Sequence, residues 1–422
     1  MRLSLNEALI LSSKSNIALK QSKENILVKD YSVASNSASF LPEVGITAVA
    51  ATRRDREPYY GESEVPLTGR DHNFYKGEIY LEWNLFRGFK DQNLLNSKKS
   101  ELEIARVTYV ELSAQTARDV IEKYFEIQML NIQLSALKEA QASRQKQFND
   151  IKNRIKVGRS TKLELLEAEY KFKQKQPEII AAQADIKKAT LDLLRLMGAS
   201  VNQKLILLDP LKSAHRTILK EPLPEMSKLL ESAFLQNPKL KRLVLESEKT
   251  SFELSQTGAG HWPTLDFRLA TGTQAFLREQ VGEAPARTFE GQIVLTVPVF
   301  NGGRAFTDAL GRKSKLTESR LEEAKYRQEL LSLLHSGYTD YEVAKSQHLI
   351  AKDNIAVAEA TISQAENLYR SGRATLTTVL DAYSKKAEAV SSEAEAIFKQ
   401  IKSTILIKSL LGTLRLVKTE EL

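Results

Sequence analysis

Apolar and polar residues alternate in four short stretches of the chain. In the last of them, Leu295, Val297 and Val299 occupy every second position and are separated by Thr296 and Pro298. A period of two predicts strands with one apolar and one polar face. This pattern fits a half-buried sheet, and it fits equally a transmembrane barrel that is apolar outside and wet inside. The four predicted strands lie at about 42–52, 74–86, 264–271 and 289–300.

Long helices follow the strands. Residues 90–156 contain neither Pro nor Gly, and at about 1.5 Å per residue they predict a helix of roughly 100 Å. From Leu376 to Ile405, apolar or small residues recur mostly at spacings of four and three, which predicts a heptad seam. The stretch from Leu165 to Leu193 has the same seam, with Lys175 as the exception. Pro177 lies within that stretch and is expected to kink the helix, because an interior proline removes a backbone hydrogen bond.

The two halves of the chain repeat one pattern. An offset of 214 residues aligns "LEWNLFRGF" at Leu81–Phe89 with "LTVPVFNGG" at Leu295–Gly303. The same offset aligns "VGRSTKLELLEA" at Val157–Ala168 with "SGRATLTTVLDA" at Ser371–Ala382, and it takes Gly198 onto Gly412. Several coincidences at one spacing indicate an internal duplication.

Upstream of the strands the offset becomes 221, and it takes Asn16 onto Asn237 and Pro42 onto Pro263. The extra residues of the first half fall within the polar segment 53–72, of the kind that tolerates insertion at a loop tip. We therefore predict two structural repeats, each with a helix, two strands and a helical hairpin. They are residues 1–214, with a hairpin tip near 157–161, and residues 215–422, with a tip near 371–375.

Both hairpins are predicted to be antiparallel, because only a few residues separate their helices at "KVGRST" and "RSGRAT". Gly158 and Gly372 supply the positive φ that such a turn needs. Each tip would then lie a long-helix length from the strands. Four strands cannot close a barrel, since about eight are the minimum for a single-chain barrel. If the strands span a membrane, several protomers must share one barrel.

Composition narrows the functions that the chain can have. Cysteine is absent, which excludes disulfides, thiolate metal sites and cysteine nucleophiles, and the five histidines are scattered without ligand spacing. We find no nucleophile–base set and no nucleotide-binding loop, so we expect no enzyme activity, no metal and no cofactor. The net charge of +8 allows a nucleic-acid surface, but Lys and Arg are interleaved with Glu in stretches such as "RLEEAKYRQEL", as on a solvated helix face.

Membrane and export signals of the helical kind are missing from the sequence. No run approaches the roughly 18 consecutive apolar residues of a membrane-spanning helix. The first residues, "MRLSLNEALILSSKSN", lack the uninterrupted apolar core and the cleavage site of a signal peptide. Either the protein stays in the cytosol, or this numbering starts after a removed signal.

The chain resembles the TolC family of outer-membrane efflux and secretion channels over nearly its whole length. The resemblance rests on "VPVFNGGR" at Val297–Arg304, its copy "WNLFRGFK" at Trp83–Lys90, the two turn motifs and the "LLGTL" that ends the last helix. It implies a mixed α/β membrane protein, a homotrimer in which each repeat adds two strands to a shared twelve-stranded β-barrel. Long antiparallel coiled-coil helices would continue the barrel as a periplasmic α-helical tunnel.

The resemblance makes the strand-to-helix connections the junction between barrel and tunnel. A Gly-Gly pair before a helix is also found in phosphate-binding loops, but the lysine and the spacing of that motif are missing here. The junction residues would be Gly88, Pro298, Gly302 and Gly303.

The resemblance also implies a gate, in which acidic residues just past the turns ring the narrow periplasmic entrance, disfavour anions and bind cations that block flow. Asp381 matches the second aspartate of the family's "DVLDA"-like pattern, Thr378 stands where the first would be, and Glu164 matches an acidic position of the first repeat. Glu167 follows on the same helix face. Ordinary solvated charges near a helix N-terminus, where acids are favoured, are the alternative interpretation. The tips that would contact an adaptor contain Val157, Gly158, Arg159, Ser371, Gly372 and Arg373.

These features predict a passive exit duct in the outer membrane of a Gram-negative bacterium, with its helical tunnel in the periplasm and its signal peptide removed. Its expected partners are two further copies of the chain, a periplasmic adaptor (membrane fusion protein), an inner-membrane transporter and outer-membrane lipid, but not nucleic acid. The duct would serve a tripartite efflux pump or a type I secretion system, and the sequence leaves drugs, metal ions and proteins open as cargo. The alternative is a cytosolic basic coiled-coil scaffold or nucleic-acid-binding protein, which would bind nucleic acid in a salt-dependent manner.

Overall fold

The computed structural model describes residues 1–55, 70–158, 160–200, 202–218, 223–275, 286–300, 302–414 and 416. They form two compact units. The first contains Met1–Asn25, Arg106–Arg242 and Ala324–Leu422, and the second contains Ile26–Ala105 and Leu243–Glu323. These units are not the two repeats, because each repeat contributes segments to both.

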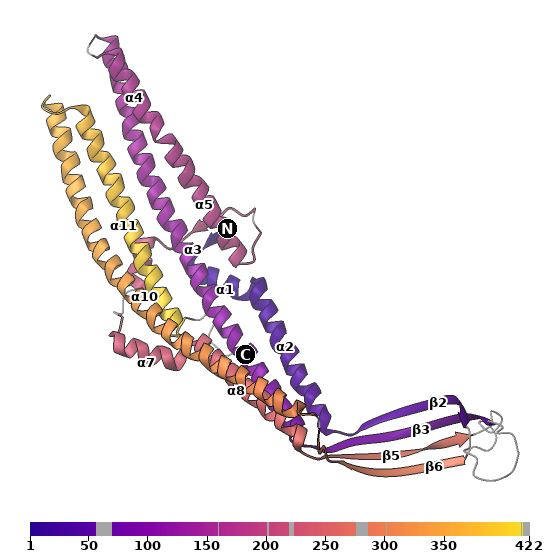
Figure 1. Ribbon diagram of the computed structural model, residues 1–422. Helices are drawn as coiled ribbons and strands as arrows, with labels where there is room; N and C mark the ends of the chain where they lie inside the picture. The colour runs from indigo at the N-terminus through magenta and orange to yellow at the C-terminus, as the bar shows by residue number, and fades with distance from the viewer. Residues whose placement is uncertain are drawn as a thin grey trace, which may run out of the picture. The chain divides into compact units, whose positions relative to one another are not determined.

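Helices account for most of the described residues (Figure 1). In the part of the chain that is described, no helix is both long and apolar enough to cross a membrane. The α-helices are α1 (Leu5–Ser15), α2 (Ile17–Ser37), α3 (Lys90–Lys156), α4 (Lys162–Gln174), α5 (Gln176–Leu196), α6 (Leu211–Ile218), α7 (Met226–Gln236), α8 (Pro238–Gly258), α10 (Arg304–Arg370) and α11 (Leu376–Leu410). The strands are β1 (Arg2–Leu3), β2 (Glu43–Asp55), β3 (Arg70–Arg87), β4 (Ile206–Leu207), β5 (Thr264–Ala275) and β6 (Ala286–Thr296).

Two helical hairpins dominate the first unit (Figure 1). In one of them α3 turns back into α4 and α5, and in the other α10 turns back into α11. The predicted kink at Pro177 takes the form of a break at Lys175. There α4 ends, and α5 begins with the proline in its first turn, where a missing N–H costs no hydrogen bond. The heptad seam of α11 is buried at Leu380, Ala394, Ile397, Ile401 and Ile405.

The main core of the first unit lies where α3, α5 and α11 meet. Val120, Tyr124, Phe125, Leu193 and Ile401 are fully buried in one cluster, to which Leu3 and Ala8 of the N-terminal segment also belong. Burial of large side chains of this kind contributes about 1.5–3 kcal/mol each. The N-terminal segment is held to this core by a short parallel pairing of β1 with β4, in which Leu3 lies opposite Leu207.

A polar contact that occurs once in each repeat explains part of the sequence duplication. The Asn16 side chain donates to the Leu196 carbonyl at 2.8 Å and accepts from the Leu19 N–H at 3.2 Å. The Asn237 side chain repeats the arrangement with Leu410 and Leu240, at 2.9 Å each. Each asparagine thus caps its own helix and ties it to the end of the hairpin.

A glycine is also required after each hairpin, because the backbone there passes very close to the residue before the capping asparagine. Gly198 and Gly412 have φ of 63° and 68°, and a Cβ on either would collide with a backbone carbonyl, that of Ser15 or of Gln236. Only glycine combines this conformation with this approach.

The second unit contains a four-stranded antiparallel sheet in the order β2-β3-β5-β6 (Figure 1). The central pairing of β3 with β5 joins the two repeats, and a bulge interrupts it between Asn84 and Phe86. The last strand ends at Thr296, whereas the alternation predicted a strand up to residue 300. Pro298 lies in this difference and cannot donate a ladder hydrogen bond, so the apolar alternation continues past the end of the paired strand.

The two faces of the sheet differ in polarity. On one face, Glu78 is buried between Lys76 and Arg268, with N–O distances of 2.6 and 2.8 Å. The opposite face is apolar and exposed. Its large side chains include Val44, Ile46, Ile79, Trp83, Leu85, Phe289, Ile293 and Leu295, all more than a third exposed.

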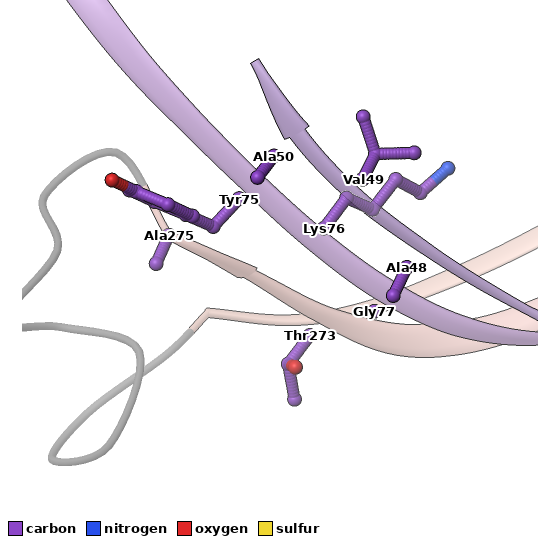
Figure 2. A pocket seen from close by; sticks show the side chains of 8 residues that line it. All are labelled: Ala48, Val49, Ala50, Tyr75, Lys76, Gly77, Thr273 and Ala275. Carbon is purple, nitrogen blue, oxygen red and sulfur yellow. The ribbon is translucent and has the colours of Figure 1, made fainter. Parts of the chain in front are cut away.

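Small residues hollow the apolar face at one place. Ala48, Gly77 and Thr273 lie opposite one another across three strands, and so do Ala50, Tyr75 and Ala275. These residues line an open cavity of about 340 Å³, and Figure 2 shows Thr273 and Ala275 directed away from the side of the sheet on which Val49 and Lys76 project. Val49 and Lys76 also line the cavity.

Tyr124 provides the sharpest test of how the first unit is held together. Its buried hydroxyl shares its single proton between the Leu3 carbonyl at 3.0 Å and the Asp209 carboxylate at 3.1 Å, and it accepts from the Asp209 N–H at 3.1 Å. Burial raises the pKa of Tyr124 to about 12, so the hydroxyl keeps its proton at neutral pH. The phenol therefore joins α3, the N-terminal segment and the segment before α6.

We expect Tyr124→Phe to destabilise the protein by about 1–3 kcal/mol, because the Leu3 carbonyl, the Asp209 carboxylate and the Asp209 N–H each lose a hydrogen bond to the phenol. The measurement is the midpoint of thermal unfolding in detergent, followed by circular dichroism. Tyr109→Phe is the matched control, since the half-buried Tyr109 hydroxyl makes no hydrogen bond in the described part of the chain. Equal midpoints for Tyr124→Phe and the control would contradict the assigned role.

Candidate functional site

The hairpin turns of the first unit contain most of the residues that the sequence predicts to be functional. Gly158 and Gly372 have φ of 74° and 71°, and nothing lies within 4 Å of a Cβ built on either. The Gly158 N–H bonds the Ile155 carbonyl at 3.0 Å, and the Gly372 N–H bonds the Tyr369 carbonyl at 3.1 Å. Each glycine ends a long helix by the left-handed backbone conformation alone.

The first residues of α4 form a capping box. Thr161 is the N-cap, and its hydroxyl accepts from the Glu164 N–H at 3.2 Å, while the Glu164 carboxylate accepts from the Thr161 N–H at 3.2 Å. The Ser160 hydroxyl also donates to this carboxylate. These bonds lower the pKa of Glu164, the Ser160 hydroxyl having the larger effect. Because the folded pKa is lowered, the ionised carboxylate stabilises the helix start at neutral pH, and this contribution is lost as the pH falls through the lowered pKa.

The second hairpin has the same cap without the charge. Thr375 is the N-cap of α11, and its hydroxyl accepts from the Thr378 N–H at 3.4 Å and lies 3.1 Å from the Thr378 hydroxyl. Thr378 therefore occupies the position that Glu164 holds in the first repeat. The equivalence found in the sequence is an equivalence of capping positions.

The predicted gate residues are all exposed, and the structure does not bring the two pairs together. In the described part of the chain, no hydrogen bond or ion pair joins Glu164 or Glu167 to Thr378 or Asp381. Val157, Gly158, Ser371, Gly372 and Arg373 are exposed at the turns. Arg159 lies outside the described residues. No group of three His, Cys, Asp or Glu in the described chain could hold a metal ion.

Sequence reasoning missed a contact that joins the two hairpins beside their turns. Arg154, in the last turn of α3, donates to the Tyr369 hydroxyl in the last turn of α10, and its guanidinium lies 5.5 Å from the centre of the Tyr369 ring. A hydrogen bond together with a cation–π contact contributes about 1–2 kcal/mol. The two residues are 215 positions apart, and no motif in the sequence connects them.

Further polar contacts join the same helices behind the turns. Arg144 donates to the Lys171 carbonyl at 2.9 Å and to the Ser384 hydroxyl at 3.3 Å, so it touches both hairpins. Lys386 lies 3.6 Å from Glu139 on one hairpin and 3.6 Å from Glu359 on the other. The Arg154–Tyr369 contact is therefore the outermost of a series of links between the hairpins.

The predicted junction residues lie in the second unit, where strands give way to long helices. Gly88 and Phe89 have φ of 61° and 64°, and Gly302 and Gly303 have φ of 69° and 78°. The repeat offset of 214 residues makes Gly302–Gly303 the equivalent of Gly88–Phe89. A Cβ on Gly88 would lie 2.5 Å from the Trp262 Cβ, so glycine is required there for space as well as for conformation.

Phe89 is the one non-glycine residue with positive φ in the described chain. Its ring packs edge-on against Phe86 and Trp262, with centroids 5.2 and 5.8 Å apart, which offsets the cost of the strained backbone. Pro298 follows β6 and borders an open cavity of about 530 Å³ at this junction.

Both repeats match one family of proteins. The sequence model of the family described as outer membrane efflux protein matches residues 11–199 and 229–413. The outer membrane efflux protein BepC of Brucella suis is 21% identical over 379 residues, which are 90% of this chain and 78% of BepC.

Solved structures of similar fold include transmembrane channels and outer-membrane proteins. CusC, described in terms of transmembrane channel formation, has a TM-score of 0.83 at 14% identity, with 96% of this chain and 91% of CusC covered. VceC of Vibrio cholerae has a TM-score of 0.80 at 16% identity, with 97% and 96% covered. At these identities the likeness establishes the fold, which is that of the TolC-like channels.

Proposed function

Because the chain belongs to the outer membrane efflux protein family, we propose that it is the passive exit duct of a multi-protein export system, gated at its two helical turns. As an efflux channel of the outer membrane it is a transport protein and not an enzyme. The family membership favours this function over a cytosolic scaffold or a nucleic-acid-binding protein.

The observation that carries the proposal is the four-stranded sheet. One face is apolar and exposed, the other carries the Lys76–Glu78–Arg268 ion pairs, and β2 and β6 stand at the two ends of the strand order. In lipid, every backbone N–H and C=O needs a partner, so a sheet with open edges must be closed by other strands. Three copies of the chain, pairing β6 of one with β2 of the next, would close a twelve-stranded barrel with the apolar face towards lipid.

The long helices supply the second part of the duct. α3 and α10 have 67 residues each, and each begins directly after a pair of residues with positive φ, Gly88–Phe89 or Gly302–Gly303. In a trimer the two hairpins of each chain would form a helical tunnel in the periplasm, with six turns at its entrance. An adaptor would bind these turns and couple the duct to an inner-membrane transporter, in a tripartite efflux pump or a type I secretion system.

The contacts beside the turns support a gate that opens when the hairpins separate. Separation of the tips requires the Arg154–Tyr369 contact to break, while the links at Arg144 and Lys386 lie farther from the turns. A partner that binds better to the separated tips shifts the population towards the open state. The family fold and the described contacts do not distinguish among drugs, metal ions and proteins as cargo.

Removal of the tip carboxylates tests the selectivity of the duct. Combining Glu164→Gln with Asp381→Asn removes two exposed charges per chain, while the glutamine keeps an acceptor for the capping box. A unit charge acts on an ion with about 1 kcal/mol at 4 Å in water, so we expect a several-fold lower cation-to-anion permeability ratio and weaker block by divalent cations. The measurement is the reversal potential in a salt gradient across a planar bilayer.

The control combines Glu24→Gln with Glu248→Gln, which removes two exposed carboxylates from α2 and α8, away from the turns. A reversal potential that is the same in the tip variant and the control would contradict the selectivity role. A preparation that conducts no ions at all would contradict the duct itself.

Release of the hairpin contact tests the gate. Arg154→Ala removes both the hydrogen bond and the cation–π contact, so we expect a several-fold higher mean single-channel conductance, because three such contacts would close one trimer. Tyr369→Phe keeps the ring and should give a smaller increase. Arg370→Ala is the control, since Arg370 pairs with Glu366 of its own helix. Wild-type conductance in Arg154→Ala would rule out this contact as a closing element.

A further inference from the structure

The two hairpin tips are equivalent in the repeat but differ in charge. Residues 144–175 of the first hairpin contain ten Lys or Arg and four Asp or Glu, a net charge of +6. The equivalent residues 358–389 of the second hairpin contain four of each and have no net charge. The excess charge of the whole chain is therefore concentrated on one of its two tips.

The lysines nearest the first turn have no ionic partner. Lys152 and Lys156 in the last turns of α3, and Lys162 at the start of α4, are exposed and form no ion pair within the described residues. At the second tip, Arg370 pairs with Glu366 and Lys386 lies between two glutamates, so only Arg373 and Lys385 form no ion pair within the described residues. Unpaired like charges repel one another, so a cluster of them favours an anionic surface nearby.

The first tip also exposes an apolar stripe whose equivalent positions in the second tip are polar or buried. Leu163, Leu166 and Tyr170 are 66, 53 and 67% exposed and lie on one face of α4, at spacings of three and four residues. Val157 at the turn is 67% exposed. The offset of 214 replaces these four residues by Thr377, Leu380, Ser384 and Ser371, and Leu380 is buried. Charge and apolar exposure thus occur together on the first tip and are both missing from the equivalent positions of the second.

We propose that the first hairpin tip alone carries the main recognition surface for the partner, and that this partner presents an acidic helix with apolar side chains. The proposal rests on the duct function proposed above and assigns the chemistry of its partner. Leu163, Leu166 and Tyr170 at helical spacing fit the apolar face of a helix, and Lys152, Lys156 and Lys162 select glutamates or aspartates that flank it.

Charge excludes a second copy of the same tip as the occupant, because two surfaces of net charge +6 repel each other. The second tip of another copy has four acidic residues balanced by four basic ones, so it offers no net negative charge. An acidic helix of another protein, with apolar side chains on one face, complements both the unpaired lysines and the exposed apolar side chains of the first tip. In a trimer, three binding tips would then alternate with three tips of little affinity.

Designed peptides test the proposal without knowledge of the natural partner. The probe is a helical-hairpin peptide with leucines on one face and flanking glutamates. The control peptide has lysines in place of these glutamates. Binding to the purified full chain in detergent is measured by fluorescence anisotropy at low and high salt. We expect the acidic peptide to bind at least about tenfold tighter than the basic one in low salt, with the difference shrinking in high salt as exposed charges are screened.

Two double variants that change the net charge equally, one at the first tip and one elsewhere, locate the binding surface. Lys156→Glu with Lys162→Glu should reduce binding of the acidic peptide about tenfold or more, and Lys156→Gln with Lys162→Gln should give an intermediate loss. Lys345→Glu with Lys385→Glu changes the charge equally at exposed positions of α10 and α11 and should leave binding unchanged. Leu163→Ser with Tyr170→Ser should weaken the binding of both peptides, because both have the apolar face.

Equal binding of the two peptides, or equal losses in the two glutamate variants, would overturn the proposal. Loss of the trimer in Lys156→Glu with Lys162→Glu, seen by size-exclusion chromatography with light scattering, would overturn it too and assign the surface to a neighbouring copy. Bilayer conductance of the same preparations separates the two levels of inference. Normal conductance without charge-selective binding refutes the partner chemistry alone, whereas absent conductance refutes the duct.

Discussion

The backbone hydrogen bonds of the four-stranded sheet are the constraint on which the account depends. β2 and β6 stand at its two ends, and an apolar face accompanies the open edges. In water such edges invite aggregation, and in lipid they cost several kcal/mol for each unsatisfied group. Closure by further copies of the same chain resolves both problems, because β6 of one copy can pair with β2 of the next. The proposed trimer, its lipid-facing surface and the proposed duct all follow from that closure.

The duplication supplies the same physical device at equivalent places in both repeats. Asn16 and Asn237 each tie a helix to a hairpin end, beside a glycine that approaches a carbonyl too closely for any side chain. The left-handed pairs Gly88–Phe89 and Gly302–Gly303 turn a strand into a long helix in the same manner. The tips differ in chemistry, because one carries a net charge of +6 and exposed apolar side chains, whereas the other has no net charge and carries Thr377, Ser384 and Ser371 in place of three of them. Duplication preserved the framework, and the tips diverged.

Features that depend on local sequence could be predicted, and features that depend on contacts between distant segments could not. The periods of two and of four-then-three are local, so strands and helices could be placed, and the fixed offset revealed the repeats. The end of β6 could not be placed, because the alternation continues through Pro298 although the pairing stops. The capping role of Glu164 is local and is signalled by Thr161 three residues before it, but Glu164 is interpreted from the sequence only as a gate residue or a solvated charge. The Arg154–Tyr369 contact joins residues that no motif connects, so only the fold reveals it.

Particle symmetry tests the central claim, that the sheet is closed by copies of the same chain, most directly. The measurement is electron microscopy of the full chain purified from outer membranes in detergent. The account predicts hollow particles with threefold symmetry and a barrel at one end. Single, unsymmetrical solid rods, or a protein recovered only in the soluble fraction, would contradict it, because the edges of β2 and β6 would then be satisfied in another way.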